Sequence, residues 1–271
     1  MPDAVVSARA GSLVLEERAG SVVTLRFNRP ERLNALNVEL GEAILAALRR
    51  AASDESARCV VLTGAGRGFC AGGDLALLRD VRSRNAIHEL EALLRAGKDI
   101  VLTMATMPKP VLAAVNGPAA GGGMNLALAC DLRIASELAS FGEAFAQVGL
   151  FPDFGGMYFL PRLVGISRAA ELFYTGEMIS ATEAARMGIV NHVVSHDKFE
   201  AETQALAARL AGAPPLAMRA VKHVLVGSQR AQLEAVLDEE IRRQAVCFAS
   251  EDCAEALEAF FAKRKPQYRG R

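Results

Sequence analysis

The sequence predicts an α/β fold, in which the strands of a buried sheet alternate with helices, followed by a helical C-terminal region. Three observations indicate this. Short apolar runs alternate with stretches of helical periodicity as far as residue 195. Two of these runs lead directly into glycine-rich turns, at 68–74 and 117–123. From residue 196 onward the pattern is purely helical. We therefore expect an α/β core over 1–195 and a helical region over 196–271.

The first half of the core is expected to contain three strands and two helices. Residues 13–17 and 22–27 have the apolar content and alternation of strands. The segment 38–52 carries its apolar residues at helical spacing. The apolar run 59–63 predicts a buried strand before the first glycine turn. A long helix over 86–107 follows, with leucines on one face, and Pro108 ends it.

The second half of the chain continues the alternation and then becomes helical. A strand (111–115), the second glycine turn, a short helix (124–129) and two further strands (132–135 and 190–194) are expected. Ser180 and Glu183 form a capping box that begins a helix, and Gly188 ends it. In the C-terminal region, Pro214 and Pro215 separate two helices, and 233–248 is strongly amphipathic. Such a region has no apolar partner of its own, so we expect it to pack onto another subunit.

Composition limits the function classes. The chain has 271 residues, 51% hydrophobic and 23% charged, with a formal net charge of zero. A neutral chain gives no reason to expect electrostatic capture of nucleic acid or of an acidic membrane. Its N-terminus does not resemble a signal peptide and no apolar run has the length of a membrane span, so we expect a cytoplasmic protein. The five cysteines and four histidines show no metal-ligand spacing, so no metal is expected.

The two glycine-rich turns, GFCAGGD at 68–74 and GPAAGGG at 117–123, suggest an oxyanion hole. Glycine allows a tight turn and lets backbone N–H groups approach a ligand closely. Each turn leads from a buried strand into a helical stretch, whose N-terminus carries positive potential. Two such turns could aim two N–H groups at the same oxygen. The run that begins at Gly64 resembles a dinucleotide fingerprint, but Phe69 occupies the third glycine position, so that match fails.

Nearly the whole chain resembles the crotonase superfamily, also called the enoyl-CoA hydratase/isomerase family. Any one motif is weak, but together and in this order they are specific. The matching motifs are Asn28-Arg29-Pro30 with Leu33-Asn34-Ala35-Leu36, residues 68–75, Lys109-Pro110 with Val115-Asn116-Gly117, residues 121–123, Ala129-Cys130-Asp131, Phe141-Gly142, Leu160-Pro161-Arg162 and Lys263-Arg264-Lys265-Pro266.

This resemblance implies a spiral of ββα units, a C-terminal helical region that mediates trimerisation, and assembly as trimers or dimers of trimers. It implies an acyl-CoA thioester as substrate, with coenzyme A as part of the substrate and no separate cofactor. The N–H groups of Gly73 and Gly122 would hold the thioester oxygen. The expected substrate and CoA contacts are Arg29, Arg32, Leu33, Ala35, Ala71, Gly72, Asp74, Leu75 and Phe145, with Phe260 and Lys263 approaching from a neighbouring subunit.

The catalytic carboxylates of the hydratases are missing at the matching positions. Asn125 stands where hydratases have one glutamate, and Phe145 stands where they have the other. Hydration needs that pair to activate water and protonate carbon, so efficient hydration is not expected. Instead Asp153, in the run GLFPD, matches the isomerase branch, which includes the ring-1,2-epoxyphenylacetyl-CoA isomerases of phenylacetate degradation. We expect Asp153 to move a proton as acid and base, with Asn125 hydrogen-bonding substrate or water.

Other interpretations stay open. Glu143 lies two residues before Phe145, so on a strand it would share its face and rival Asp153 as a pocket carboxylate. An atypical hydratase, a dehalogenase that uses Asp153 as nucleophile, and a non-catalytic acyl-CoA-binding scaffold are the remaining functions. Without the resemblance, Asp153 is an ordinary turn residue. Asp74 is expected to cap a helix, Asp131 to be structural and Cys70 to be an inert buried filler.

Overall fold

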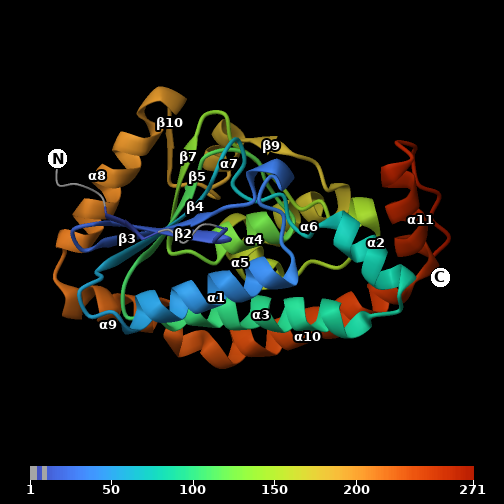
Figure 1. Cartoon of the computed structure of the whole chain (residues 1–271), viewed down its shortest axis with the longest axis horizontal. Coiled ribbons are helices and arrows are strands. Elements are labelled where there is room, and N and C mark those ends of the chain that lie inside the picture. Colours follow the sequence, from blue (N-terminus) through green and yellow to red (C-terminus); the bar gives the residue numbers. More distant parts are fainter. Residues whose placement is uncertain (1–4, 8–10) are drawn as a thin grey trace.

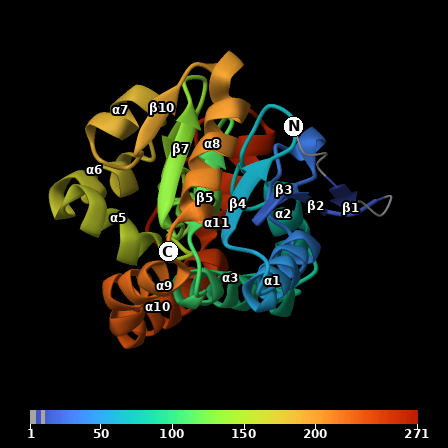
Figure 2. The same ribbon diagram turned by 90° about the vertical axis from the view of Figure 1, so that its left-hand side faces the viewer.

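The structure is a computed structural model that describes residues 5–7 and 11–271 (Figures 1 and 2). Its strands are β1 (Val5–Ser7), β2 (Val14–Ala19), β3 (Val22–Phe27), β4 (Cys59–Gly64), β5 (Val111–Val115), β6 (Ala119–Ala120), β7 (Leu132–Ser136), β8 (Ser140–Gly142), β9 (Ile179–Ser180) and β10 (His192–Val194). Its α-helices are α1 (Val38–Ser53), α2 (Leu75–Ser83), α3 (Ile87–Thr106), α4 (Gly122–Leu128), α5 (Gly156–Val164), α6 (Ile166–Thr175), α7 (Ala181–Arg186), α8 (Phe199–Gly212), α9 (Pro215–Leu225), α10 (Arg230–Ala249) and α11 (Glu251–Phe261).

Most expected elements are confirmed to within a few residues. The strand expected at 111–115 is β5, and the helix expected at 86–107 is α3. Ser180 accepts a hydrogen bond from Glu183 N at the start of α7, as the capping box predicts. The expected last strand begins later, at His192, because Val190 lies in the segment after α7. The helices α5 and α6 and the short strands β1, β6, β8 and β9 were not predicted, and of α2 only the start after Asp74 was expected.

The main sheet determines where the glycine turns lie. Within the described residues its strand order is β1-β2-β3-β4-β5-β7-β10, antiparallel among β1, β2 and β3 and parallel from β3 onward. Val60 of β4 pairs with Val111 of β5. Because β4 and β5 are parallel neighbours, their carboxyl ends meet at one sheet edge, and so do the turns that follow them. A smaller sheet, in the order β6-β8-β9, begins at the second turn.

Helices cover both faces of the central strands β4 and β5, and every residue of these two strands is buried for that reason. Val60 and Leu62 of β4 pack into the larger core cluster with residues of α1 and α3. Cys59 and Val61 face the opposite side, where Phe199 and other residues of α8 cover them. Figure 2 shows α8 in front of the strands, while Figure 1 shows α1, α3 and α10 running side by side.

The C-terminal helices pack against the core of their own chain. Helix α10 lies along α3 and touches α5, and α11 packs against α2. Leu233 and Leu237 of α10 are fully buried in the main core cluster. The apolar residues Leu233, Leu237 and Phe248 of α10 are thus covered by this chain itself and not, as we expected, by another subunit. Among the described residues, no helix has the length and apolar content needed to cross a membrane.

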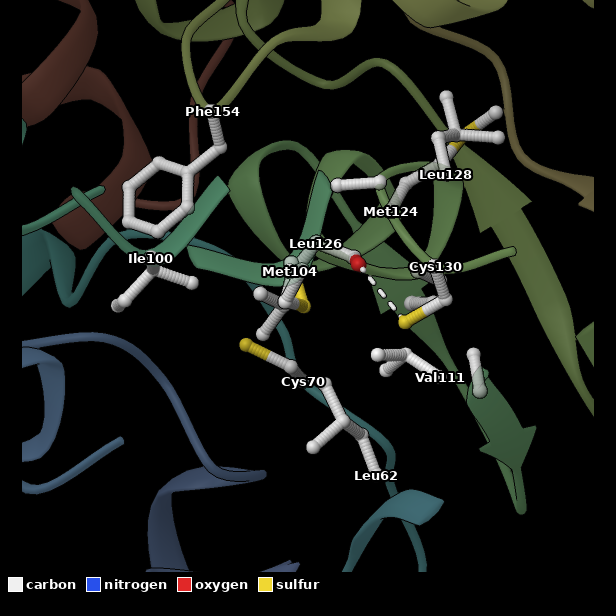
Figure 3. Close-up of a cluster of buried hydrophobic side chains, with 14 of the residues drawn as sticks. Leu62, Cys70, Ile100, Met104, Val111, Met124, Leu126, Leu128, Cys130 and Phe154 are labelled. Carbon is white, nitrogen blue, oxygen red and sulfur yellow. Dashed lines mark hydrogen bonds between the residues drawn. The ribbon is translucent and has the colours of Figure 1, made fainter. Parts of the chain in front are cut away.

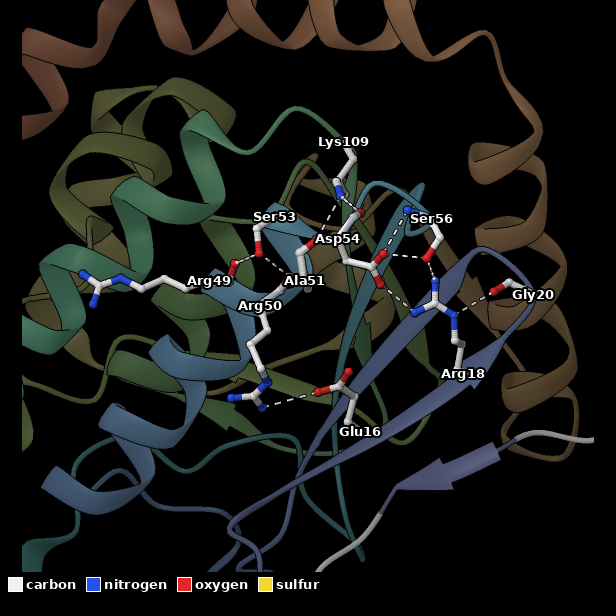
Figure 4. Close-up of polar contacts among 10 residues, drawn as sticks. All are labelled: Glu16, Arg18, Gly20, Arg49, Arg50, Ala51, Ser53, Asp54, Ser56 and Lys109. Carbon is white, nitrogen blue, oxygen red and sulfur yellow. Dashed lines mark hydrogen bonds and ion pairs between the residues drawn. The ribbon is translucent and has the colours of Figure 1, made fainter.

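Lys109, of the Lys109-Pro110 motif, has a structural role. Its ammonium group is nearly buried, and it donates hydrogen bonds to the carbonyl oxygens of Ala51 (2.9 Å) and Asp54 (2.7 Å) at the C-terminus of α1 (Figure 4). The Asp54 carboxylate in turn pairs with Arg18 of β2 at 2.6 Å. A cation at a helix C-terminus satisfies carbonyls that have no partner within the helix. Lys109 therefore fixes α1 to the start of β5.

Candidate active site

The two glycine turns pack directly against each other, backbone to backbone. Cys70 N donates to Pro118 O at 3.2 Å, and Ala120 N donates to Cys70 O at 3.0 Å. A Cβ on Gly123 would lie 2.0 Å from Cys70 O, so only glycine fits there. A Cβ on Gly72 would lie 2.7 Å from Ala120 O and 3.5 Å from Gly122 N. These glycines allow the close approach of the two turns.

Gly73 and Gly122 each present an N–H group that the fold leaves free. Leu36 bonds to the residues on either side of Gly73, through Leu36 N to Gly72 O (2.7 Å) and Asp74 N to Leu36 O (2.9 Å). Gly122 is the first residue of α4, where N–H groups lack an intrahelical acceptor. Within the described part of the chain, neither N–H donates to a protein acceptor.

Both glycines line a cavity of about 1100 Å³. Much of its wall is apolar and comes from α2, α3, α11 and the segment after β8, while polar side chains reach it from several separate segments, among them Arg32, Asp153 and Gln244. Eleven of the expected site residues line it, and these are Arg32, Ala35, Ala71, Gly72, Gly73, Asp74, Leu75, Gly122, Phe145, Asp153 and Phe260.

Four expected site residues lie outside the cavity wall. Arg29 is held in the protein by an ion pair with Asp74 (3.0 Å) and a bond to Ala35 O (2.5 Å). Leu33 adopts a left-handed backbone conformation and packs against Gly68. Asn125 is fully buried beneath the cavity. Lys263 is exposed and ends the last turn after α11. Arg29, Leu33 and Asn125 thus support the cavity from behind.

Phe260 was expected to approach from a neighbouring subunit, but it lines the cavity of its own chain. Phe261, Arg264, Lys265, Pro266 and Tyr268 line the cavity with it. Tyr268 Oη donates to Gln147 O at 2.8 Å, which ties the C-terminal segment to the far wall. The cavity is therefore bordered by this chain's own C-terminus, because α11 packs back against α2.

Asp153 presents a carboxyl group to the cavity next to Gly122. A Cβ on Gly122 would lie 3.2 Å from Asp153 Oδ1. Oδ1 is shielded from solvent and has no hydrogen-bond partner, while Oδ2 accepts from Gln244 Nε2 at 3.1 Å. Burial raises the pKa of Asp153 from 3.8 to about 7, and the Gln244 hydrogen bond opposes that rise. Among the described residues Asp153 forms no ion pair.

Two residues of α10 that we did not predict hold the Asp153 loop. Gln244 Oε1 accepts from Phe151 N (2.9 Å) while its Nε2 bonds to Asp153. Glu240, one turn earlier, accepts from Gly155 N (2.8 Å) and Met157 N (3.1 Å), at the N-terminus of α5. Both side chains fall on the same stripe as Leu237 and are almost fully buried. In the sequence, the clue to this role was that two polar residues, Glu240 and Gln244, interrupt the apolar face of an amphipathic helix.

Glu143 does not line the cavity, and the prediction that it might share the face of Phe145 is wrong. Strand β8 ends at Gly142, and the chain then turns, so the two-residue alternation of a strand no longer applies. Glu143 is fully buried, and neither of its carboxyl oxygens has a hydrogen-bond partner. Burial, with the nearby Asp153 carboxyl, raises its pKa well above the usual value.

The residues expected to be structural have structural contacts. Asp74 Oδ1 accepts from Ala76 N (3.1 Å) and Leu77 N (3.4 Å), which caps α2. Asp131 accepts from Val111 N (2.7 Å) and pairs with the nearly buried Lys222 (2.7 Å). Cys70 lies in the apolar cluster shown in Figure 3, and burial raises the pKa of its thiol to about 12. A thiol with so high a pKa is a poor nucleophile at neutral pH.

The chain is similar over nearly its full length to known proteins. The profile of the family described as "Enoyl-CoA hydratase/isomerase" matches residues 17–271. A "1,2-epoxyphenylacetyl-CoA isomerase" of Escherichia coli is 39% identical over 95% of this chain and 98% of its own length. A "Probable enoyl-CoA hydratase" of Rhodobacter capsulatus is 44% identical over 93% of this chain and 95% of its own.

The fold agrees with this similarity. A crystal structure titled as an enoyl-CoA hydratase from Mycobacterium avium subsp. paratuberculosis superposes with a TM-score of 0.86 at 33% identity, over 95% of this chain and 98% of the other. A second, from Bacillus halodurans, gives a TM-score of 0.87 at 30% identity over 92% of this chain and 100% of the other. The chain belongs to the enoyl-CoA hydratase/isomerase family and has the crotonase fold.

Proposed function

We propose that this protein isomerises an enoyl-CoA thioester, moving its double bond from the 3 to the 2 position, with Asp153 as acid and base. One observation carries this: Asp153 lines a largely apolar cavity, and its Oδ1 lies beside Gly122 without a hydrogen-bond partner. Asp74 is the other carboxylate in the described cavity wall, and its oxygens cap α2 and pair with Arg29. Asp153 is therefore the carboxyl group available to a substrate.

A single carboxyl group suffices for this reaction because the proton is moved and not consumed. Asp153 would remove a proton from the γ carbon, which gives an enolate on the thioester. The N–H groups of Gly73 and Gly122 would stabilise the negative oxygen, a contribution of about 2.7–4 kcal/mol for each donor. Asp153 would return the proton to the α carbon. A pKa of about 7 suits a group that must both accept and release a proton at neutral pH.

Hydration is less well supported by this arrangement. It requires a group that activates water and one that protonates carbon. Glu143, the alternative carboxyl group that the sequence suggested, lies outside the cavity wall. Ring-1,2-epoxyphenylacetyl-CoA is a second candidate substrate for isomerisation, supported by the name of the Escherichia coli relative and by the large apolar wall.

The cavity wall also includes three cations that would bind the phosphates of coenzyme A: Arg32, Arg264 and Lys265.

The test is turnover of 3-enoyl-CoA, followed by the absorbance of the conjugated 2-enoyl product. We expect the wild type to be active and Asp153→Asn to lose at least about a hundredfold in kcat, the usual scale of general acid–base catalysis. Asp99→Asn, an exposed carboxylate in a surface ion pair, is the matched control and should be unaffected. Equal activity of wild type and Asp153→Asn would reject Asp153 as the acid/base. Faster loss of 2-enoyl-CoA by water addition would favour the hydratase.

We also propose that the protein forms a homo-oligomer, a trimer or a dimer of trimers. The support is a set of exposed apolar side chains on one C-terminal helix, α9: Leu216, Val221, Val224 and Leu225. Exposed apolar residues gathered on one helix are typical of subunit contacts. Light scattering on the purified protein measures the mass directly. A monomer at micromolar concentration would contradict the proposal.

A further inference from the structure

A glycine interrupts the long helix α3 at the point where the Asp153 loop packs against it. Gly97 lies in the interior of this helix of 20 residues, where glycine is less favourable than alanine. A glycine in such a position indicates a packing requirement. Here the requirement is the ring of Phe154. A Cβ on Gly97 would lie 2.6 Å from Phe154 Cε2 and 2.7 Å from Cζ. We call the space beside Gly97 that this ring fills the Gly97 notch.

The Phe154 ring is confined in the Gly97 notch. The side chain is buried, with 4% of its surface exposed. Figure 3 shows the ring pointing from its loop toward Ile100, one turn further along α3. The next residue of the loop packs on the same helix, since a Cβ on Gly155 would lie 3.4 Å from Val101 Cγ1. The ring therefore cannot leave the notch without displacing its neighbours.

The same ring also contacts the corner of the cavity where Asp153 lies. A Cβ on Gly122 would lie 3.6 Å from Phe154 Cδ2 and 3.2 Å from Asp153 Oδ1. Phe154 Cδ2 is at the same time 3.0 Å from the Cβ position of Gly97. Two consecutive side chains, those of Asp153 and Phe154, thus lie against Gly122, and one of them connects Gly122 to α3.

An unusual backbone turn brings these two side chains together. Phe154 has a φ of +52° and Gly155 a φ of +84°, so two consecutive residues are left-handed. This conformation is rare for phenylalanine and persists where the surroundings hold it in place. Glu240 accepts from Gly155 N at 2.8 Å, and Gly156 N donates to Asp153 O at 3.1 Å. These hydrogen bonds hold the backbone of the turn, and the Gly97 notch holds its side chain.

We propose that Phe154 is a positioning residue, whose ring in the Gly97 notch sets the distance between the Asp153 carboxyl group and the Gly122 N–H. This inference rests on the proposed function, in which both groups act on one thioester. Phe154 lies outside the described cavity wall, so it acts through Asp153 and does not touch the substrate. A displacement of a reacting group by about 1 Å can lower a rate by about a hundredfold. A ring forced out of the notch should have an effect on this scale.

An exchange of size between the two positions tests the proposal. Gly97→Ala fills the notch and should lower kcat for 3-enoyl-CoA about a hundredfold, with little change in KM. Phe154→Leu lacks the two ring atoms nearest to Gly97 and should lower kcat by at most about tenfold. In the Phe154→Leu background, Gly97→Ala should then cost less than about threefold, because the clash is gone. The double variant should therefore be more active than Gly97→Ala alone.

Two control variants separate positioning from a loss of packing. Gly212→Ala, in helix α8, places its Cβ where no atom lies within 4 Å and should leave kcat unchanged. Phe199→Leu removes the same ring atoms from the core on the other face of the sheet. It should lower the temperature of thermal denaturation and leave kcat unchanged. If Gly97→Ala and Phe154→Leu behaved like Phe199→Leu, with lower stability and normal kcat, the proposal would be overturned.

Crystal structures of the wild type, Gly97→Ala and the double variant give a test that needs no activity. In Gly97→Ala, Asp153 Oδ1 should move relative to Gly122 N, and in the double variant it should return. A displaced Phe154 ring beside an unmoved Asp153 would reject the positioning role. If Gly97→Ala does not fold, Phe154→Leu decides in its place, and an unmoved Asp153 with normal kcat counts against the proposal. Full activity of Asp153→Asn would reject the proposed function, whereas the crystal structures would still show whether the ring positions Asp153.

Discussion

Gln244 Nε2 donates a hydrogen bond of 3.1 Å to Asp153 Oδ2 and joins residues that are 91 positions apart in the sequence. The same side chain accepts from Phe151 N through its Oε1. Helix α10 therefore fixes both the backbone and the carboxyl group of the Asp153 loop. The bond favours the ionised form of Asp153, against the effect of burial. Removal of this hydrogen bond should therefore raise the pKa of Asp153.

Substitution of Gln244 by Leu should shift the pH dependence of catalysis. Without the hydrogen bond, the pKa of Asp153 rises above its value of about 7, so a higher pH is needed to ionise it. The acidic limb of kcat/KM for 3-enoyl-CoA should move to higher pH, with partial recovery of activity at pH 9. Gln232→Leu, on the exposed side of the same helix, is the control. An acidic limb at the wild-type pH in Gln244→Leu would show that this bond does not tune Asp153.

As the pH rises toward 7, the activity of the wild type should increase while the contribution of Asp153 to its stability decreases. Activity needs ionised Asp153, so kcat/KM should rise with an apparent pKa near 7. Stability runs the other way, because the folded state binds the Asp153 proton more tightly than the unfolded state does. The free energy of unfolding should therefore fall as the pH rises from about 4 to about 7, by up to about 1.4 kcal/mol per pH unit for this group.

Urea denaturation at several pH values measures this, with Asp153→Asn as the reference. The difference in free energy of unfolding between wild type and variant should change over the same pH range and level off above it. A difference that is independent of pH would mean that Asp153 titrates normally in the folded protein.

Three glycine substitutions should separate folding from catalysis. Gly123→Ala places its Cβ 2.0 Å from Cys70 O and should prevent the two turns from packing, so little folded protein is expected. Gly122→Ala places its Cβ 3.2 Å from Asp153 Oδ1 and should fold but lose about 10- to 100-fold in kcat, since the acid and the N–H are both displaced. Gly73→Ala meets its nearest atom at 3.6 Å and should fold with little loss of stability.

Thermal denaturation and kcat for each variant test this order. Normal catalysis by Gly122→Ala would contradict the assignment of this corner of the cavity to the reacting thioester. A stable Gly123→Ala would contradict the close backbone packing of the turns.

Lys109→Met should lower stability without acting on the site. The substitution leaves the carbonyls of Ala51 and Asp54 without their donor, at an expected cost of about 1–3 kcal/mol. Urea denaturation gives the free energy of unfolding, and the exposed Lys198→Met serves as control. A loss below that of the control would show that α1 does not depend on this contact. The KM for substrate should be unchanged, because Lys109 lies outside the described cavity wall.

Much of the fold could be predicted from the sequence because its strands and helices have clear local patterns. The strand β5 and the helix α3 were expected within one residue of their observed bounds. The position of Glu143 could not be predicted by alternation, because the chain turns directly after β8 and the pattern of a strand ends there. Glu240 and Gln244 were missed for a related reason: their partners lie about 85 and 91 residues away.

The sequence by itself determined the α/β alternation, the two glycine turns and the set of carboxyl groups available to the site. These depend on local spacing and residue type, which a linear chain shows directly. Only the tertiary structure decided which carboxyl group faces the cavity and which is buried behind it. Asp153 and Glu143 are only ten positions apart, yet one lines the cavity and the other is sealed beneath it. Their environments differ because α10, α4 and α5 converge on the loop between them, and convergence of distant segments has no local pattern.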